Sequence, residues 1–108
     1  MIREITVEDL AANLAAKEPV CLIDVRQPWE HQIASLPGSL LAPLPELLHR
    51  LNDIRPPAGA QVIVYCHHGL RSLQGAALLQ QAGIENVASL QGGIDAWSCQ
   101  IDPTVSRY

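Results

Sequence analysis

The chain has 108 residues, of which 48% are hydrophobic, and seven basic against eleven acidic side chains give a net charge of −4. This length suits one domain with its own core, and we expect a single domain over residues 1–108, with a core from about 5 to 98 and a tail from 99 to 108. Nucleic acids and anionic membranes are recognised through basic patches, so neither is expected as a partner. The sequence has no apolar run of the roughly 20 residues that cross a bilayer, and residues 1–6 lack the features of a secretion signal, so we expect a cytoplasmic protein.

The three cysteines, Cys21, Cys66 and Cys99, are an odd number and include no Cys-x-x-Cys pair. A disulfide framework is therefore not expected, and thiols stay free in a reducing compartment. Cys21 lies inside an apolar run, where a thiol usually serves as a small buried side chain. Cys99 could approach Cys66 in space, although no second cysteine is near Cys66 in sequence.

Predicted helices and strands alternate along the first half of the chain. Thr6 is placed to cap a helix that Pro19 ends. Residues 20–23 form a continuous apolar run, which is typical of a strand buried on both faces of a parallel sheet. Three more elements are expected before a loop at 55–60: a helix from Pro28 to about Ala34, at most a very short strand at 40–41, and a helix over 43–51.

The second half continues this alternation. We expect a strand at 61–65, a helix over 73–82 that Gly83 ends, a strand at 86–90, and a last helix near 94–99. Such alternation predicts an α/β sandwich with a largely parallel sheet. Binding sites in these sheets lie beyond the carboxyl ends of the strands, which is where Asp24, Arg26 and Cys66 fall.

The segment between the predicted strand and helix of the second half is the strongest candidate site. It reads Cys66-His67-His68-Gly69-Leu70-Arg71-Ser72. Backbone N–H groups of such a loop and of the first helical turn have no intrahelical partners, so they converge on an anion. Gly69 permits a positive φ that turns successive amides inward. A cysteine in this setting is favoured as a thiolate, and we predict that Cys66 is a nucleophile.

Two further residues of this segment have alternative interpretations. Arg71 opposes the helix dipole, which favours a role in holding an anion or in pairing with a carboxylate such as Asp24, although a solvated arginine is the simpler alternative. Ser72 could be the N-cap of the following helix, which would explain it without catalysis.

The histidines do not suggest a metal centre. His67 and His68 are adjacent, so we expect their side chains to point in different directions, and Cys-His-His in direct succession is a poor chelate. Either histidine could donate to a bound anion or lie exposed on the loop. His31 and His49 are placed on helix surfaces without a role. No metal site and no cofactor are expected, because Gly92-Gly93 alone is too little for a dinucleotide site.

Taken together, these pieces resemble a single-domain rhodanese. Four motifs carry the resemblance over about residues 5–97: Leu22-Ile23-Asp24-Val25-Arg26 with Glu30, Leu36-Pro37-Gly38-Ser39, Val64-Tyr65 with the Cys66–Ser72 segment, and Leu90-Gln91-Gly92-Gly93-Ile94-Asp95-Ala96-Trp97. One departure is a missing histidine, since the family commonly has Gly-His-Ile-Pro-Gly-Ala where this chain has residues 34–39. Trp97 is expected in the core, and Trp29 is expected to pack on its helix or to flank the pocket.

The resemblance implies a rhodanese-like three-layer sandwich around a mostly parallel five-stranded sheet. It also implies a cysteine that takes a sulfane sulfur from a donor such as thiosulfate, becomes a persulfide and passes the sulfur to cyanide or a thiol acceptor. Carried over by position, Cys66 is the nucleophile and residues 67–72 form the anion-binding loop, with Asp24 and Arg26 in support.

Two other functions remain as alternatives. A phosphatase or arsenate reductase would use the same kind of cradle, but cysteine phosphatases place five residues between cysteine and arginine, and only four separate Cys66 from Arg71. A sulfur-relay or docking module would instead serve a protein partner, such as a sulfur-carrier protein or a cysteine desulfurase.

Overall fold

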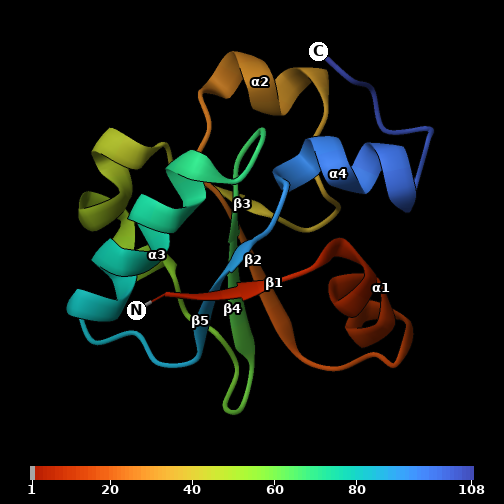
Figure 1. Ribbon diagram of the computed structural model, residues 1–108. Helices are drawn as coiled ribbons and strands as arrows, with labels where there is room; N and C mark the ends of the chain where they lie inside the picture. The colour runs from red at the N-terminus through yellow and green to blue at the C-terminus, as the bar shows by residue number, and fades with distance from the viewer. Residues whose placement is uncertain (1) are drawn as a thin grey trace.

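In the computed structural model, which describes residues 2–108, every pair of neighbouring strands in the central sheet is parallel (Figure 1). The strands lie in the order β1 (Arg3–Ile5), β5 (Val87–Leu90), β4 (Gln61–Tyr65), β2 (Val20–Asp24) and β3 (Leu40–Leu41). The predicted α/β class is confirmed, and the described sheet is wholly rather than mostly parallel. Strand β1 was not predicted, because its three residues show no period and only Ile5 is buried.

Five helical elements accompany the sheet: α1 (Val7–Ala15), α2 (Pro28–Ile33), η1 (Leu44–Asp53), α3 (Leu70–Gln81) and α4 (Gly93–Gln100). Thr6 caps α1 as predicted, because its Oγ1 accepts the Asp9 N–H at 3.1 Å. The segment η1 is a run of 3₁₀ turns rather than the expected α-helix. Pro43 and Pro45 remove two backbone donors at its start. No helix among residues 2–108 is long and apolar enough to cross a membrane.

Helix α3 begins three residues earlier than its apolar pattern indicates. Its N-cap is Gly69, which adopts a left-handed φ of 101°. Ser72 therefore lies inside the first turn, and the expectation that it caps the helix was wrong. The reason is conformational: glycine takes this backbone geometry without the steric cost that a Cβ would add, so the helix can start directly after the loop.

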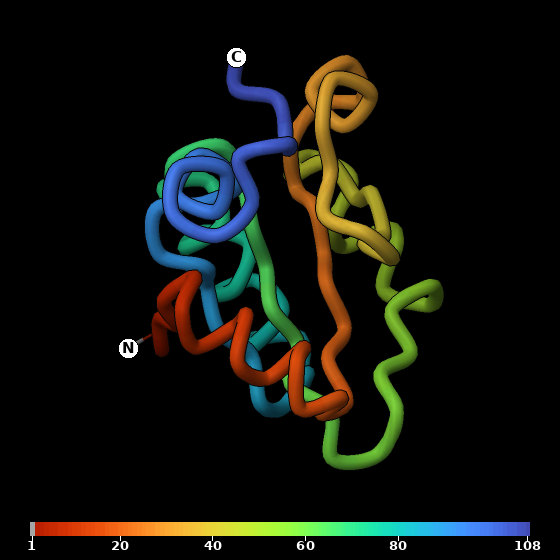
Figure 2. Tube along the Cα trace, turned by 90° about the vertical axis from the view of Figure 1, so that its right-hand side faces the viewer, coloured from red at the N-terminus to blue at the C-terminus, as the bar shows by residue number. Residues whose placement is uncertain are grey.

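An apolar core lies on each face of the sheet, beneath the helices that form the outer layers. Figure 2 looks onto one of these faces, with α1 and α4 in front of the strands. Strand β4 supplies both cores, since Ile63 and Tyr65 face the first core while Val62 and Val64 face the second. Helices α1 and α4 cover the first core, and η1 and α3 cover the second. Trp97 is buried in the first core, as predicted.

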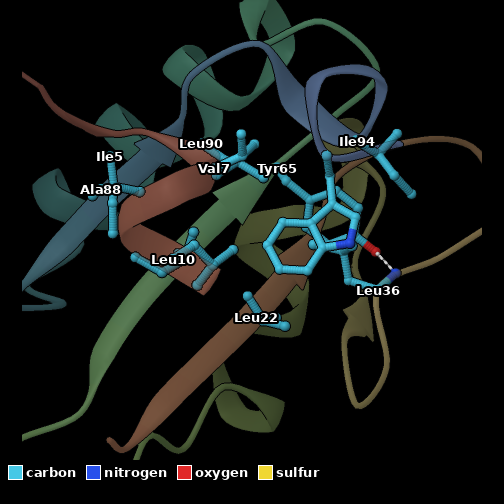
Figure 3. Close-up of a cluster of buried hydrophobic side chains, with 11 residues drawn as sticks. Ile5, Val7, Leu10, Leu22, Leu36, Tyr65, Ala88, Leu90 and Ile94 are labelled. Carbon is cyan, nitrogen blue, oxygen red and sulfur yellow. Dashed lines mark hydrogen bonds between the residues drawn. The ribbon is translucent and has the colours of Figure 1, made fainter. Parts of the chain in front are cut away.

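The first core also holds the turn that follows α2 (Figure 3). The Tyr65 hydroxyl accepts the Leu36 N–H at 3.1 Å, and Ser39 Oγ lies 2.8 Å from the same oxygen. The phenol at the end of β4 thus fixes the Leu36–Ser39 turn beside the sheet.

Strands β2 and β4 are neighbours and end together. Asp24 is paired in register with Tyr65, and the Val25 N–H donates to the Tyr65 carbonyl at 3.2 Å. Asp24 and Arg26 are therefore brought beside the Cys66 loop, at the carboxyl ends of the strands, where α2 lies (Figure 1).

Candidate active site

Cys66 lies directly after β4, and only 1% of its surface is exposed. Its Sγ accepts the Gly69 N–H at 3.1 Å and the Ser72 N–H at 3.3 Å. These are the inward-pointing amides that the loop-then-helix pattern predicts. A sulfur held by two backbone donors at the start of a helix sits in an environment that favours negative charge.

Ser72 is part of this cradle rather than a helix cap. Its side chain is fully buried, its Oγ lies 3.5 Å from Cys66 Sγ, and it shares a 2.7 Å hydrogen bond with Ser89 Oγ. Ser89 belongs to β5, the neighbour of β4, so a second strand contributes a side chain to the surroundings of the sulfur. Ser89 was not predicted as part of the site, because a single serine in a strand gives no local signal.

The outer side of the loop is held by the start of α4. Ile94 N–H donates to the Cys66 carbonyl at 2.9 Å, and Asp95 N–H donates to the His67 carbonyl at 3.1 Å. Gly93 adopts a φ of +62°, and a Cβ at this position would lie 2.5 Å from the carbonyl oxygens of both loop residues. The Gly-Gly motif therefore lets α4 approach the loop closely enough to hold its carbonyls outward.

Arg71 forms a bidentate ion pair with Glu30 of α2. Nη1 lies 2.7 Å from Oε1 and Nη2 lies 2.9 Å from Oε2. Arg71 thus pairs with a carboxylate, as predicted, but the partner is not Asp24. The Asp24 carboxylate is instead bound by Arg26 and contacted by His31. Hydrogen bonds from Arg71, and then from Tyr108 and the Gln27 N–H, lower the pKa of Glu30 to about 2 even though burial opposes this shift.

Asp24 and Arg26 form a second ion pair, and both side chains are completely buried. Arg26 donates from Nε to Asp24 Oδ1 at 2.9 Å and from Nη2 to Oδ2 at 2.8 Å, and it also donates to the Ala34 carbonyl at 2.6 Å. Burial is the largest single influence and disfavours the charge, but the hydrogen bonds with Asp24 and Tyr108 and the negative charge of Asp24 together outweigh it and raise the pKa of Arg26. His31 has a contact as well, since its Nδ1 lies 2.7 Å from Asp24 Oδ2.

His67 and His68 lie face to face, so the expectation that they point in different directions was wrong. Their ring centroids are 3.9 Å apart at an interplanar angle of 30°. Burial, with a further contribution from the neighbouring His68, lowers the pKa of His67. The exposed His68 has its Nδ1 3.9 Å from an Asp95 carboxylate oxygen. Within residues 2–108, no group of three or more His, Cys, Asp or Glu side chains is arranged to hold a metal ion.

Tyr108 completes the site, although the aperiodic tail that carries it gave no hint of this. Its ring stacks on His67 with centroids 4.0 Å apart and an interplanar angle of 9°. Its hydroxyl donates to Glu30 Oε2 at 2.6 Å and accepts from Arg26 Nη1 at 2.7 Å. Leu70 and Trp29 are open to solvent, at 78% and 58% exposed, so Trp29 is not packed on its helix as expected.

All three cysteines are free thiols. Cys21 is half-buried in β2, where burial raises its pKa, and Cys99 is exposed on α4. Cys66 is the buried member, and it is the one whose sulfur accepts two backbone N–H groups.

Several known proteins are similar to this chain in sequence or in fold. A sulfurtransferase of Allochromatium vinosum is 39% identical, with 91% of this chain and 90% of that protein matched. The thiosulfate sulfurtransferase GlpE of Pseudoalteromonas translucida is 31% identical, with 88% and 89% matched. A crystal structure of a rhodanese-like domain protein from Staphylococcus aureus superposes with a TM-score of 0.83, at 25% identity and 99% coverage of both chains. Some other relatives are longer, and the chain spans 38% and 26% of two of them.

The rhodanese-like domain family matches residues 6–100. This range includes the cysteine loop, both ion pairs except for their Tyr108 link, and the Gly-Gly motif. The chain belongs to the rhodanese-like family of sulfurtransferases.

Proposed function

We propose that this protein moves a sulfane sulfur from thiosulfate or a persulfide donor, through a persulfide on Cys66, to cyanide or a thiol acceptor. The observation that carries the proposal is the environment of Cys66 Sγ, which accepts the N–H groups of Gly69 and Ser72 while α4 binds the loop carbonyls on the other side. The name of the Pseudoalteromonas relative supports thiosulfate as the donor to test first.

In the first half-reaction the Cys66 thiolate attacks the outer sulfur of thiosulfate. A sulfur–sulfur bond to Cys66 forms, the bond between the two sulfur atoms of thiosulfate breaks, and sulfite leaves with the electron pair. The negative charge then lies on the terminal sulfur of the persulfide. The N–H donors of residues 67–72 are suited to hold that charge, as an oxyanion hole does.

In the second half-reaction the acceptor attacks the terminal sulfur. Cyanide becomes thiocyanate, or a thiolate becomes a persulfide, and the Cys66 thiolate is regenerated when the sulfur–sulfur bond breaks. Neither half-reaction requires a cofactor. The reaction requires a reduced cysteine, for which a reducing compartment such as the cytoplasm is suited.

The two ion pairs have supporting roles in this proposal. Glu30 occupies the Arg71 guanidinium with two hydrogen bonds, so the pair fixes the start of α3 beside the loop. Asp24 and Arg26 anchor the end of β2 beside it. Both pairs hold the cradle in place and leave the chemistry to Cys66.

Mass measurement of the intact protein after incubation with thiosulfate tests the proposal. The wild type should gain the mass of one sulfur atom, which cyanide or a reducing thiol then removes. Cys66→Ala should gain nothing, whereas Cys99→Ser should load like the wild type. An unchanged wild-type mass would rule out thiosulfate as donor, and loading of Cys66→Ala would rule out Cys66.

A protein acceptor or donor is a second candidate, and the exposed apolar side chains beside the loop favour it. Leu70 and Trp29 present apolar surface next to Arg71 and Glu30. A small anion such as thiosulfate gains nothing from apolar contacts, whereas a protein partner would bury this surface. Leu70→Ser should slow sulfur exchange with a cysteine desulfurase or a sulfur-carrier protein about tenfold and leave the rate with thiosulfate unchanged. Equal effects on both rates would exclude a protein-specific role for Leu70.

A phosphatase reaction is disfavoured by the short loop. The cradle closes on the sulfur itself, with the Ser72 N–H 3.3 Å from Sγ. Turnover of a phenyl phosphate that disappears in Cys66→Ser would reverse this order of the two functions.

A further inference from the structure

The segment that follows α4 is docked on the body of the domain. The Asp102 carboxylate accepts hydrogen bonds from the Thr104 N–H and hydroxyl, the Ser98 hydroxyl donates to the Val105 carbonyl, and Arg107 pairs with Asp95 at 2.9 Å. Figure 2 shows this segment rising from α4 toward α2. Its course brings Tyr108 to the side of the cysteine loop.

The Tyr108 hydroxyl connects the two ion pairs of the site. It accepts from Arg26, whose other contacts are with Asp24 and the Ala34 carbonyl, and it donates to Glu30, which binds Arg71. Arg26 is fully buried and Glu30 nearly so. A buried charged group left without a partner is costly. The Tyr108 hydroxyl gives a hydrogen-bond partner to one charged group of each ion pair, Arg26 and Glu30.

The Tyr108 ring fixes the opposite side of the loop. It stacks on His67, which in turn lies against His68. The Trp29 ring meets the Tyr108 ring edge to face, with centroids 6.0 Å apart. Tyr108 thus contacts His67 directly and reaches Arg71 through Glu30. These two residues flank the loop that surrounds Cys66, whose sulfur is almost fully covered.

We propose that Tyr108 is a positioning residue for sulfur transfer, which holds His67 and Arg71 of the cysteine loop in place and thereby restricts the size of the molecules that reach the buried sulfur. This inference rests on the proposed function of Cys66. Its substrate consequence is a preference for slim donors and acceptors, such as thiosulfate, over bulky ones.

The test compares the access of two thiol reagents to Cys66 in three proteins: the wild type, Tyr108→Leu and Tyr108→Phe. Alkylation is followed at Cys66 by peptide mass, with iodoacetamide as the small reagent and a bulky aryl maleimide as the large one. Tyr108→Leu should raise the ratio of large-reagent to small-reagent rates at least fivefold. Tyr108→Phe keeps the ring stack and should restore the wild-type ratio. General loosening of the fold would instead accelerate both reagents together.

Sulfur transfer gives the second readout. Tyr108→Leu should raise the KM for thiosulfate about tenfold with a smaller change in kcat, and Tyr108→Phe should raise it about threefold, since only the link between the ion pairs is lost. Ser106→Ala is the matched control, because Ser106 is exposed on the same tail and is not one of the docking residues named above. Its ratio and KM should equal those of the wild type.

The outcomes separate the two proposals. An unchanged reagent ratio in folded Tyr108→Leu would overturn the role of Tyr108, even if Cys66 loads sulfur normally. Absence of sulfur loading in the wild type would overturn the proposed function, while the reagent ratio still decides whether Tyr108 controls access. If Tyr108→Leu fails to fold, Tyr108→Phe alone decides. A wild-type KM for thiosulfate in Tyr108→Phe would overturn the role of the hydroxyl in linking the ion pairs. A tenfold change in the reagent ratio of Tyr108→Phe would overturn the role of the ring.

Discussion

The carboxyl ends of β2 and β4 lie side by side, but they are built in opposite ways. The end of β2 carries an ion pair between Asp24 and Arg26, and both side chains are fully buried. The end of β4 is filled by a neutral backbone that surrounds one sulfur atom. Every strong donor at the first end is occupied by a partner within the protein, whereas the amides at the second end are directed at the group proposed to react.

This difference shows how the site divides its work. Paired charges hold elements together but leave little for a substrate, since breaking a buried pair is costly. Backbone amides that are held in place by α4 can serve an anion without such a loss. The Glu30–Arg71 pair and Tyr108 join the two ends. Substitutions at each end should therefore fail in different ways.

The largest effect is expected from closing the gap between α4 and the cysteine loop. Gly93→Ala should destabilise the protein by about 3–5 kcal/mol, because it adds a Cβ in a left-handed conformation and against backbone. Gly38→Ala is the matched control, since Gly38 has a φ of +76° but open space around it. It should cost only about 1–2 kcal/mol. Urea unfolding curves compare the two, and equal losses would show that the close approach of α4 has no energetic role.

Breaking the connection between the two ends should have the next largest effect. Glu30→Gln removes the charged partner of Arg71 and should cost about 1.5–3 kcal/mol, the usual range for hydrogen bonds to charged groups. Sulfur loading by thiosulfate should slow about tenfold but persist, because the backbone donors to Cys66 remain. Glu46→Gln, on the exposed surface of η1, is the control and should change neither quantity. Complete loss of loading in a folded Glu30→Gln protein would mean that Glu30 takes part in the chemistry itself.

The same contact predicts a pH dependence of stability. The ordinary pKa of glutamate is 4.5, and that of Glu30 is lowered to about 2 in the folded protein. A depressed carboxyl pKa stabilises the fold above the unfolded-state value, and this contribution is lost as the pH falls through the folded-state value. The difference in stability between the wild type and Glu30→Gln should therefore be constant above pH 5 and shrink toward pH 2. Chemical unfolding at several pH values measures it, and a difference that does not change across this range would contradict the assignment.

The smallest effect is expected inside the cradle itself. Ser72→Ala removes the 2.7 Å hydrogen bond with Ser89 but keeps the Ser72 N–H that reaches Cys66. We expect a loss of about 1–2 kcal/mol, because the buried Ser89 hydroxyl is left without this partner, and only a small reduction of the loading rate. Ser106→Ala, on the exposed tail, should have no effect. A loss of loading as severe as that in Cys66→Ala would show that the Ser72 hydroxyl, rather than the backbone, is the essential donor.

The features that could be predicted from the sequence are local ones. Apolar runs at 20–23 and 61–65 indicate buried parallel strands, because both faces of such strands are covered. Thr6 and Gly69 carry the backbone preferences of a cap and of a left-handed turn, and a cysteine between strand and helix meets free amides by virtue of its position. Each of these signals needs only a few neighbouring residues.

The tertiary structure alone decided which distant groups meet. Arg71 binds Glu30 at a separation of 41 residues, and Tyr108 binds Glu30 at 78, so no local spacing distinguishes Glu30 from Asp24 as the partner. The stacking of His67 between His68 and Tyr108 and the placement of Ser89 beneath Ser72 depend in the same way on how helices and strands pack. Local sequence determined where Cys66 and its backbone donors would lie, and packing determined which side chains hold its loop, because contact energies across the chain exist only after the layers have come together.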